Sequence, residues 1–229
     1  MTTILVTRPK EEAKKTALSL EKVGFKTIIE PLIAIEQNFD AKSKISKLIK
    51  PKSVILITSA NALPALCNID RNQKIITVGK VSAAAIMNLG FNNVTAAGGD
   101  VASMINMINS NYPKNTDFLY LSADITSGDL QKSLKNNGYN CDKIIAYHAK
   151  PIDNFPNSRE KADAVTLFSK RTAEIFIKLD QGKLCDKPIF CISCNVASAF
   201  DNTPYKKIHV SNLPNSESLL ELIADFQFT

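Results

Sequence analysis

The sequence predicts an α/β fold with two similar domains, each a parallel sheet flanked by helices. The first observation is an internal duplication. Residues Leu20–Phe25 recur as Leu134–Tyr139, 114 positions further along the chain. Ile75–Gly79 recurs as Ile189–Ser193 with the same spacing of 114 residues. Solenoid repeats are roughly 20–50 residues long, so this longer spacing indicates two domains rather than an array of short units.

The second observation is the alternation of short apolar runs with helical patterns, which is typical of βα units and parallel sheets. The third is length, because 229 residues are enough for two compact domains of about 100–115 residues. Ligand pockets are frequent at the interfaces of domains. The sequence therefore predicts a ligand site in a cleft between the two domains.

The first copy opens with an apolar strand and an amphipathic helix. Pro9 suits the first helical position, and Glu11 and Glu12 are favourable in the first turn. Gly24 suits the end of this helix, because glycine readily adopts left-handed backbone angles. The expected strands are Ile4–Thr7, Thr27–Ile29 extended by Pro31–Ile35, Val54–Thr58, Ile75–Val78 and Asn93–Ala96, with helices after Asn61, after Gly79 and over Val101–Ile108.

The second copy repeats this order. Its expected strands are Phe118–Ser122, Lys143–Lys150, Ala164–Phe168, Pro188–Ile192 and Lys207–Val210, with helices from near Thr126 or Ser127, from Thr172, after Ile192 and from Ser218. Pro151–Lys161 is the most linker-like stretch, because it combines two prolines with Asn, Asp and Ser. The runs Thr27–Ile35 and Lys143–Pro151 occupy equivalent places. They are either ordinary strands of consecutive domains or crossings between domains, and the sequence leaves both arrangements open.

Composition narrows the class of protein. The net charge of +6 permits an acidic ligand, nucleic acid included. Lysines are scattered along the chain and tryptophan is absent, which argues against a nucleic-acid-binding module with stacking platforms. No apolar stretch approaches the roughly 20 residues that span a bilayer, and no signal peptide is apparent. The five cysteines are not spaced as a secreted disulfide framework, so we expect a cytoplasmic protein.

Four strand-to-helix turns are the predicted ligand contacts. Ligands of parallel sheets bind beyond the carboxyl ends of the strands, where helix N-termini offer unpaired backbone N–H groups. A serine or threonine in one such turn is alternatively only a helix cap, but the set of four favours a site for carboxylates or phosphates. The turns are Thr7–Pro9, Thr58–Asn61, Val78–Ser82 and Phe168–Thr172, and they contain the candidate residues Thr7, Arg8, Ser59, Ser82, Ser169 and Lys170.

The sequence gives little support for metal binding, redox chemistry or nucleotide binding. Cys191 and Cys194 form a Cys-x-x-Cys pair with Cys185 nearby, but structural zinc takes four ligands and no histidine adjoins them. His148 and His209 show no carboxylate or nucleophile signature around them. Neither a P-loop nor a Gly-x-Gly-x-x-Gly motif appears, so nucleotide binding loses its main support.

A series of short motifs runs through nearly the whole chain. In order they are Ile-Leu-Val-Thr-Arg-Pro at 4–9, Leu56–Ala62, Val78-Gly79 with Ser82-Ala83, Gly99-Asp100, Leu119–Leu121, Leu134 with Gly138, Tyr147 and Ser-Glu-Ser-Leu-Leu-Glu-Leu-Ile at 216–223. Their order and spacing resemble the uroporphyrinogen-III synthase family. The resemblance implies two α/β domains, residues 1–35 with 148–229 and residues 36–147, joined by a two-stranded antiparallel linker.

The resemblance also implies an activity. Such an enzyme cyclises the linear tetrapyrrole hydroxymethylbilane, eliminates water and inverts the last pyrrole ring (ring D), with no metal or organic cofactor. We expect a cytoplasmic monomer whose partner is this small polyacid, with neither nucleic acid nor membrane. Carried over to this chain, the cleft is lined by Thr7, Arg8, Ser59, Ser82, Tyr147, Ser169 and the turn at Asn195 and Val196.

Tyr147 is the expected proton donor to the leaving hydroxyl, although a half-buried strand aromatic is an equally ordinary role for it. Two segments depart from the family pattern. Ser193–Ala197 lacks the glycine and hydroxyl of its turn, and Ser122–Asp124 places an acid where a cation is usual. The alternative function is a non-catalytic two-domain binder of a small polyacidic ligand, similar in architecture to periplasmic binding proteins, but no export signal supports it.

Overall fold

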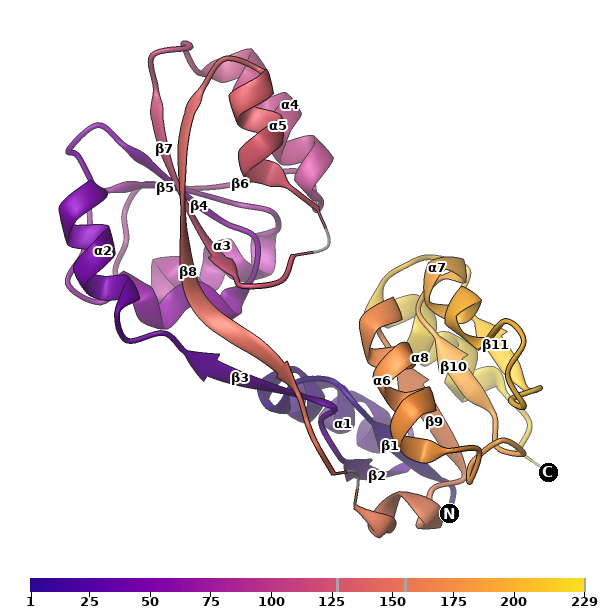
Figure 1. Cartoon of the computed structure of the whole chain (residues 1–229). Helices are drawn as coiled ribbons and strands as arrows, with labels where there is room; N and C mark the ends of the chain where they lie inside the picture. Colours follow the sequence, from indigo (N-terminus) through magenta and orange to yellow (C-terminus); the bar gives the residue numbers. More distant parts are fainter. Residues whose placement is uncertain (127, 155, 229) are drawn as a thin grey trace. The chain divides into compact units, whose positions relative to one another are not determined.

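The computed structural model (Figure 1) describes residues 1–126, 128–154 and 156–228. The chain forms two compact units. Unit 1 comprises Met1–Ala34 and Lys150–Thr229, and unit 2 comprises Ile35–Ala149. Each unit contains a sheet dominated by parallel strands, with helices packed against both faces. The predicted α/β class is therefore confirmed, whereas the cleft and the two-stranded linker stay predictions.

The sheet of unit 1 has five strands in the order β11-β10-β9-β1-β2, all paired in parallel. The strands are β1 (Thr3–Val6), β2 (Lys26–Ile29), β9 (Ala164–Leu167), β10 (Ile189–Cys191) and β11 (Ile208–Val210). Every residue of β9 and β10 is buried. This is expected of parallel strands that are covered on both faces.

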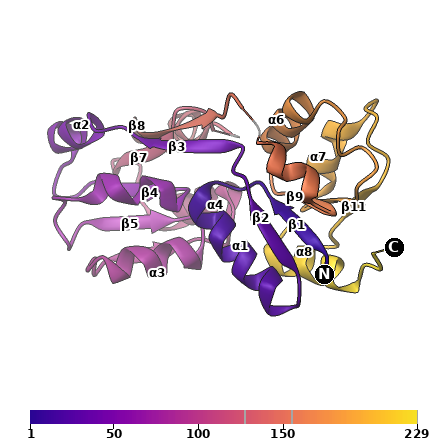
Figure 2. The ribbon, with the colours of Figure 1, turned by 90° about the horizontal axis from the view of Figure 1, so that it is seen from below.

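The helices of unit 1 lie on opposite faces of this sheet because alternate strand residues point to opposite sides. Leu5 packs with Phe176 of α6, whereas Ile4 packs with Leu20 of α1. Figure 2 shows α1 and α8 together on one side of the strands and α6 on the other. The helices are α1 (Lys10–Lys22), η2 (Asn157–Lys161), α6 (Lys170–Asp180), α7 (Cys194–Ala197), η3 (Ser198–Phe200) and α8 (Ser216–Asp225), where η denotes a 3₁₀ helix.

The sheet of unit 2 has the order β3-β8-β7-β4-β5-β6. Its strands are β3 (Ile33–Gln37), β4 (Val54–Ile57), β5 (Lys74–Thr77), β6 (Val94–Ala96), β7 (Asp117–Ala123) and β8 (Asn140–Pro151). Strands β4 to β8 pair in parallel. Asn38 donates its N–H to the carbonyl of Ala146, and Ile152 donates to that of Leu32. Along these pairs the residue numbers increase on the β3 side as they decrease on the β8 side, so β3 runs antiparallel to β8.

Two layers of helices also cover the sheet of unit 2. Ile57 packs with Ile45 of α2 on one face, and Leu56 packs with Met104 of α4 on the other. The first face also carries η1 and α3, and the second carries α5. The bounds are α2 (Ala41–Leu48), η1 (Ala60–Leu66), α3 (Lys80–Asn88), α4 (Val101–Asn111) and α5 (Leu130–Asn136).

The sheet order exchanges the first strands of the two copies. Strands β1 and β2 belong to the first copy but pair in the sheet that contains β9, β10 and β11 of the second. Strands β7 and β8 belong to the second copy but pair in the sheet that contains β4, β5 and β6 of the first. Each sheet is thus assembled from segments that are far apart in the sequence.

Three segments differ from the expectation. The run predicted over Thr27–Ile35 breaks after Ile29, and its halves β2 and β3 lie in different sheets. The helix expected after Asn61 is the 3₁₀ helix η1, which contains Pro64, a residue without an N–H to donate. The linker-like stretch Pro151–Lys161, of which Phe155 lies outside the described residues, contains η2, and Arg159 within it is only 4% exposed.

Candidate functional site

The parallel strands of unit 2 end along one edge of its sheet, the edge at which such sheets bind ligands. After β4, Ser59 caps η1, and its Oγ accepts the N–H of Asn61 at 3.3 Å. Just before it, Thr58 Oγ1 lies 3.0 Å from the hydroxyl of Tyr120. Burial raises the pKa of Tyr120, although the bond to Thr58 opposes this. The Tyr120 phenol is therefore protonated at neutral pH, and Ser59 is a half-buried helix cap.

Strand β5 ends at a glycine turn. Gly79 precedes α3, and its carbonyl accepts a hydrogen bond from Thr77 Oγ1 at 3.0 Å. A Cβ added at Gly79 would meet no atom within 4 Å, so open space adjoins the first amides of α3. Ser82 lies in that first turn and is half-buried. A helix start next to open space suits an anionic group, because the N–H groups and the helix dipole favour negative charge.

Tyr147 lies beside a β-bulge where the pairing of β7 with β8 ends. Ser122 pairs with Ile145 and Ala123 with Tyr147, so Ala146 is an extra residue on β8. The bulge breaks the alternation of the strand, and Ala146 and Tyr147 both pack in the core that α2 and η1 cover. Tyr147 is 7% exposed. Its ring is a core side chain held at the end of the ladder.

Next to the bulge, His148 contacts Asp124, the first residue after β7. His148 Nδ1 lies 3.0 Å from Asp124 Oδ2, and the second oxygen, Oδ1, accepts the N–H groups of Ile125 and Ala149 at 2.8 and 3.2 Å. Burial raises the pKa of Asp124, but the hydrogen bonds from His148 and the two amides outweigh it and lower the pKa. Asp124 is therefore ionised, while the His148 side chain is 36% exposed.

Thr7 holds the ends of two strands together in unit 1. It is fully buried, and its Oγ1 donates to the carbonyl of Thr166 in β9 at 2.8 Å. Thr166 donates in return to the carbonyl of Leu5 at 3.0 Å. Because a hydroxyl has a single proton, the Thr7 side chain donates within the protein and supports the turn that carries Arg8.

Arg8 is a fixed cation at this edge. Its guanidinium carbon lies 4.2 Å from the centre of the Phe168 ring, and Nη1 lies 3.4 Å from Thr16 Oγ1 and 3.3 Å from Ser216 Oγ. Burial lowers the pKa of Arg8, and the nearby charge of Glu12 opposes that shift. An arginine stays charged in proteins at physiological pH, so the edge of unit 1 carries a positive charge.

Ser169 is the counterpart of Ser59 in the second copy. It caps α6: its Oγ accepts the N–H of Thr172 at 3.1 Å and lies 2.7 Å from Thr172 Oγ1. Lys170 is exposed at the first position of α6. Ser169 and Lys170 follow β9, the neighbour of β1, so this turn and that of Arg8 end adjacent strands of one sheet.

The turn after β10 contributes backbone rather than side chains. Val196 is 2% exposed in the core, and its N–H donates to the carbonyl of Ser193 at 3.0 Å. Asn195 is exposed on the short helix α7. Burial raises the pKa of the Cys191 thiol to about 12, so it lacks the thiolate that metal or redox chemistry uses. Across the described residues, no group of three or more His, Cys, Asp or Glu side chains is placed to hold a metal ion.

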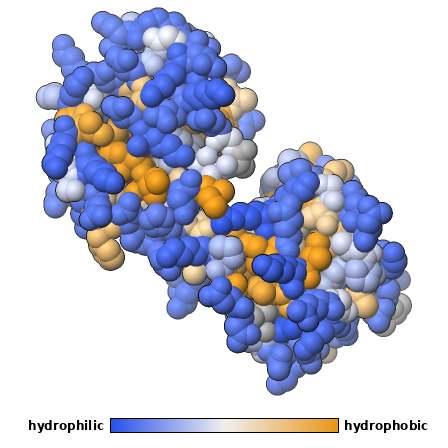
Figure 3. All heavy atoms as spheres, viewed as in Figure 1, coloured by the Kyte–Doolittle hydropathy of each residue, from blue (hydrophilic) through white to orange (hydrophobic). Residues whose placement is uncertain are grey.

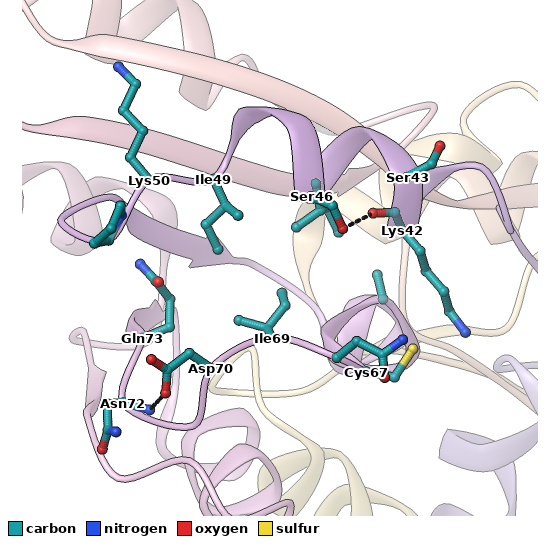
Figure 4. Close-up of a pocket in the computed structure, with 14 residues that line it drawn as sticks. Lys42, Ser43, Ser46, Ile49, Lys50, Cys67, Ile69, Asp70, Asn72 and Gln73 are labelled. Carbon is teal, nitrogen blue, oxygen red and sulfur yellow. Dashed lines mark hydrogen bonds between the residues drawn. The ribbon is translucent and has the colours of Figure 1, made fainter.

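A pocket of about 440 Å³ lies elsewhere in unit 2, between α2 and the segment of residues 67–73 (Figure 4). Lys42 and Cys67 are among its lining residues, and Asp70 Oδ1 there accepts the N–H of Asn72 at 2.9 Å. None of the predicted site residues lines this pocket. The candidate residues instead fall into two sets, Thr7, Arg8, Ser169, Lys170, Asn195 and Val196 on unit 1 and Ser59, Ser82 and Tyr147 on unit 2.

Comparison with known families identifies the family of this chain. The family model of uroporphyrinogen-III synthase HemD matches residues 14–221 of this chain. The chain belongs to this family. It is an enzyme of tetrapyrrole biosynthesis, a uroporphyrinogen-III synthase that functions in the formation of haem. The family acts on a small-molecule tetrapyrrole.

Solved structures of the family share the fold. Uroporphyrinogen-III synthetase from Helicobacter pylori matches with a TM-score of 0.65 at 15% identity, over 99% of this chain and 100% of that chain. A mutant uroporphyrinogen III synthase from the extremely thermophilic bacterium Thermus thermophilus matches with a TM-score of 0.58 at 15% identity, over 97% of each chain. No curated protein matches the sequence.

The two departures from the uroporphyrinogen-III synthase pattern have local explanations. In the turn that lacks the expected glycine and hydroxyl, the carbonyl of Ser193 accepts the N–H groups of Val196 and Ala197 at 3.0 and 3.1 Å. Backbone hydrogen bonds therefore close this turn. Asp124, which stands where a cation is usual, binds His148 from the next strand.

Sequence reasoning missed the Asp124–His148 pair and the role of Phe168. The sequence around His148 shows no carboxylate signature because its partner, Asp124, follows a neighbouring strand rather than lying near it in sequence. The sequence did contain a signal for this pair. Asp124 and His148 lie toward the carboxyl ends of two consecutive parallel strands, and such ends meet at one edge of a sheet. Phe168 similarly follows β9 and packs under a residue that follows β1.

The surface agrees with the scattered charge of the sequence. Figure 3 shows a mostly hydrophilic face in each unit with smaller apolar patches. Within the described part of the chain, no helix has both the length and the apolar character needed to cross a membrane.

Proposed function

We propose that the carboxyl-end edges of the two sheets bind hydroxymethylbilane and direct its cyclisation to uroporphyrinogen III. The domains would be residues 1–35 with 148–229 and residues 36–147, joined by a two-stranded antiparallel linker, with the substrate in a cleft between them. The hydroxyl of the substrate leaves as water. The last pyrrole ring (ring D) attacks the resulting cation and is inverted through a spiro intermediate.

The observation that carries this proposal is the pair of equivalent caps, Ser59 in unit 2 and Ser169 in unit 1. Each stands where a central strand ends, and Arg8 adds a fixed cation beside Ser169. The acetate and propionate arms of the substrate are carboxylates, which backbone N–H groups at helix starts bind well. The proposed contacts are Arg8, Ser59, Ser82, Ser169, Lys170 and the turn at Asn195 and Val196, with Thr7 supporting the first of them.

Orientation is the main catalytic contribution in this proposal. The electron-rich pyrroles of the substrate supply the chemistry once the hydroxyl leaves, so neither a metal nor an organic cofactor is needed. Holding reacting groups in the right geometry contributes at best about 7–11 kcal/mol. A set of separate carboxylate contacts on two domains is suited to folding a flexible polyacid into the geometry that favours attack at the substituted position.

Tyr147 is the proposed proton donor to the leaving hydroxyl. It lies beside the bulge at the edge of unit 2, and its ring packs in the core that α2 and η1 cover. Replacing Tyr147 with Phe should lower kcat on the order of 10²-fold with little change in KM, as is typical of a lost general acid. An unchanged kcat in Tyr147→Phe would show that Tyr147 is only a core residue.

The proposed partner is the substrate alone, in a cytoplasmic monomer that binds neither nucleic acid nor membrane. Scattered lysines and two small edges of hydroxyls and amides fit a small polyacid better than a long polyanion. Light scattering on the purified protein tests the oligomeric state, and a mass near twice that of the chain would overturn the monomer.

A coupled assay tests the site and the reaction together. Hydroxymethylbilane is generated in situ, the protein is added without metal, and the porphyrins are separated by isomer after oxidation. We expect type III well above the spontaneous type I background. Variants at Arg8, Ser59 and Ser169 should each raise KM, whereas variants in the pocket of Figure 4, such as Lys42→Ala, should not. If the pocket variants raise KM and the edge variants do not, the substrate does not bind at the two edges.

A further inference from the structure

His148 is held in one orientation by a carboxylate. Its Nδ1 lies 3.0 Å from Asp124 Oδ2, and the other oxygen of Asp124 is fixed by the amides of Ile125 and Ala149. An ionised carboxylate only accepts hydrogen bonds, so Nδ1 carries the proton of the neutral ring. The Nε2 atom then presents its lone pair, and no partner for it occurs among the described residues. With 36% of the side chain exposed, solutes reach this ring.

Charged residues occur on each strand that neighbours His148. Asp124 is the neighbour from β7. From β3, Glu36 stands directly opposite His148, given the register set by the bond from Asn38 to Ala146, and opposite residues of an antiparallel pair have Cβ atoms roughly 4.5–5.5 Å apart. Lys150, two residues further along β8, is the cation on the same side of the strand. Asp124 is thus the carboxylate in contact with the imidazole, and Glu36 is the residue opposite His148 on β3.

A base oriented by a third group is the arrangement that enzymes use for proton abstraction. Cyclisation of the tetrapyrrole needs such a group as well as an acid. We propose that His148 is the general base of this reaction, accepting at Nε2 the proton that the last pyrrole ring loses when the macrocycle closes, with Asp124 as its positioning residue. This proposal rests on the placement of the substrate at the edge of unit 2 given above.

The proton balance of the reaction defines the step. The C–O bond of the hydroxymethyl group breaks, and the oxygen leaves as water with a proton from the acid. In the closing step the free α-carbon of the last ring bonds to the bridging carbon. Its C–H bond then breaks, the electron pair returns to the ring to restore the aromatic pyrrole, and the proton passes to Nε2. Solvent returns one proton to the acid and removes one from His148, so substrate becomes product and water.

The geometry of β8 separates the acid from the base. Tyr147 packs toward the core that α2 and η1 cover, and His148, the next residue, points to the other side of the strand. One proton is needed at the oxygen of the hydroxymethyl group, and the other is released at the α-carbon of the last ring. Two groups on opposite sides of one strand can serve two such atoms of an extended substrate without exchanging protons with each other.

The decisive experiment uses substrate with deuterium at the free α-carbon of the last ring. In the wild type we expect a small isotope effect on kcat. In His148→Gln we expect kcat to fall on the order of 10²-fold, a large isotope effect because C–H cleavage becomes rate-limiting, and a KM close to that of the wild type. The matched control is His209→Gln, the same substitution at the other histidine in unit 1, which should change neither kcat nor the isotope effect.

Three further readouts separate a base from a structural residue. Imidazole added to His148→Ala should restore activity in proportion to its concentration, and it should not affect His209→Ala. Asp124→Asn keeps a hydrogen-bond acceptor but removes the charge, so kcat should fall on the order of 10-fold. The wild-type kcat should fall on the acid side of its pH profile as the base is protonated, and His148→Gln should lack that limb.

Unchanged kcat, isotope effect and pH profile in His148→Gln overturn the proposal. A rise in KM with kcat intact also overturns it, because His148 is then a carboxylate contact. A loss of melting temperature that matches the loss of activity, without rescue by imidazole, assigns a structural role instead. Wild-type protein that yields only type I product, or edge variants with unchanged KM, would instead count against the proposed function itself.

Discussion

The guanidinium carbon of Arg8 lies 4.2 Å from the centre of the Phe168 ring. Arg8 follows β1 and Phe168 follows β9, and these strands are neighbours in the sheet. The stack therefore spans two adjacent carboxyl ends and fixes a cation before any ligand arrives. Fixing a binding group in advance reduces the conformational freedom that is lost on binding, which is what a site for a flexible polyacid requires.

Replacement of Arg8 by Lys should raise KM about 10-fold while kcat changes little, because a charge-assisted hydrogen bond contributes about 1.5–3 kcal/mol. Lysine keeps the charge but loses the planar fork and the stack on Phe168. The isomer assay at varied substrate concentration measures the effect. Lys10→Gln, an exposed cation at the start of α1, is the matched control and should behave as wild type. Equal KM values for Arg8→Lys and wild type would remove Arg8 from the substrate contacts.

Ser169 allows the roles of helix cap and anion contact to be separated. Aspartate caps helices about as well as serine, so Ser169→Asp should leave the melting temperature nearly unchanged. The added negative charge should repel a substrate carboxylate and raise KM on the order of 10-fold or more. Ser169→Thr, which keeps both the cap and the neutral hydroxyl, should retain a KM near that of the wild type. If Ser169→Asp binds substrate normally, Ser169 is only a cap.

The extent to which the sequence predicts this site depends on how far a residue's partner lies along the chain. The caps at Ser59 and Ser169 are predictable because a cap bonds to amides two or three residues away. The strands are predictable because their apolar runs are short and bounded by turn residues. The Asp124–His148 pair and the stack of Arg8 on Phe168 join residues that follow different strands, so they depend on strand order, which no local pattern specifies.

The environments of two further residues were not predicted, for the same physical reason. Arg159 lies in a stretch whose prolines and polar residues indicate a linker, yet it is buried because its partner Asp180 ends α6. Tyr147 has the pattern of a strand aromatic, but its packing depends on the bulge that inserts Ala146. A bulge adds one residue and turns consecutive side chains to one face, and composition does not reveal it.

The buried pair of Arg159 and Asp180 should stabilise unit 1. Asp180 is fully buried and accepts bonds from Arg159 Nε at 3.2 Å, Leu184 N–H at 2.9 Å and the Tyr205 hydroxyl at 2.8 Å. Arg159→Met leaves that carboxylate without its cation, which should destabilise the unit by about 3–5 kcal/mol.

Hydrogen exchange of the β9 and β10 amides measures this prediction within unit 1. The control is Lys183→Met, which removes an exposed pair with Glu160 and should alter stability by at most about 1 kcal/mol. Equal exchange rates in Arg159→Met and Lys183→Met would show that the buried pair contributes no more than the exposed one.

His209 should make the protein less stable in mild acid. Its ring packs 4.7 Å from that of Phe226 and 5.4 Å from that of Phe190, measured between centroids, and burial lowers its pKa. The unfolded chain therefore binds a proton at this residue more readily than the native protein does. By linkage, stability is then lost as the pH falls from above the ordinary histidine range through the lowered pKa.

His209→Gln removes this titration, so its free energy of unfolding should fall less steeply than that of the wild type between about pH 8 and pH 5, the range that brackets histidine. Urea unfolding at several pH values measures both slopes. The variant also loses the aromatic contacts and should be less stable at every pH, so only the difference in slope tests the prediction. Parallel curves for the two proteins would mean that His209 takes up its proton equally well in the native and unfolded states.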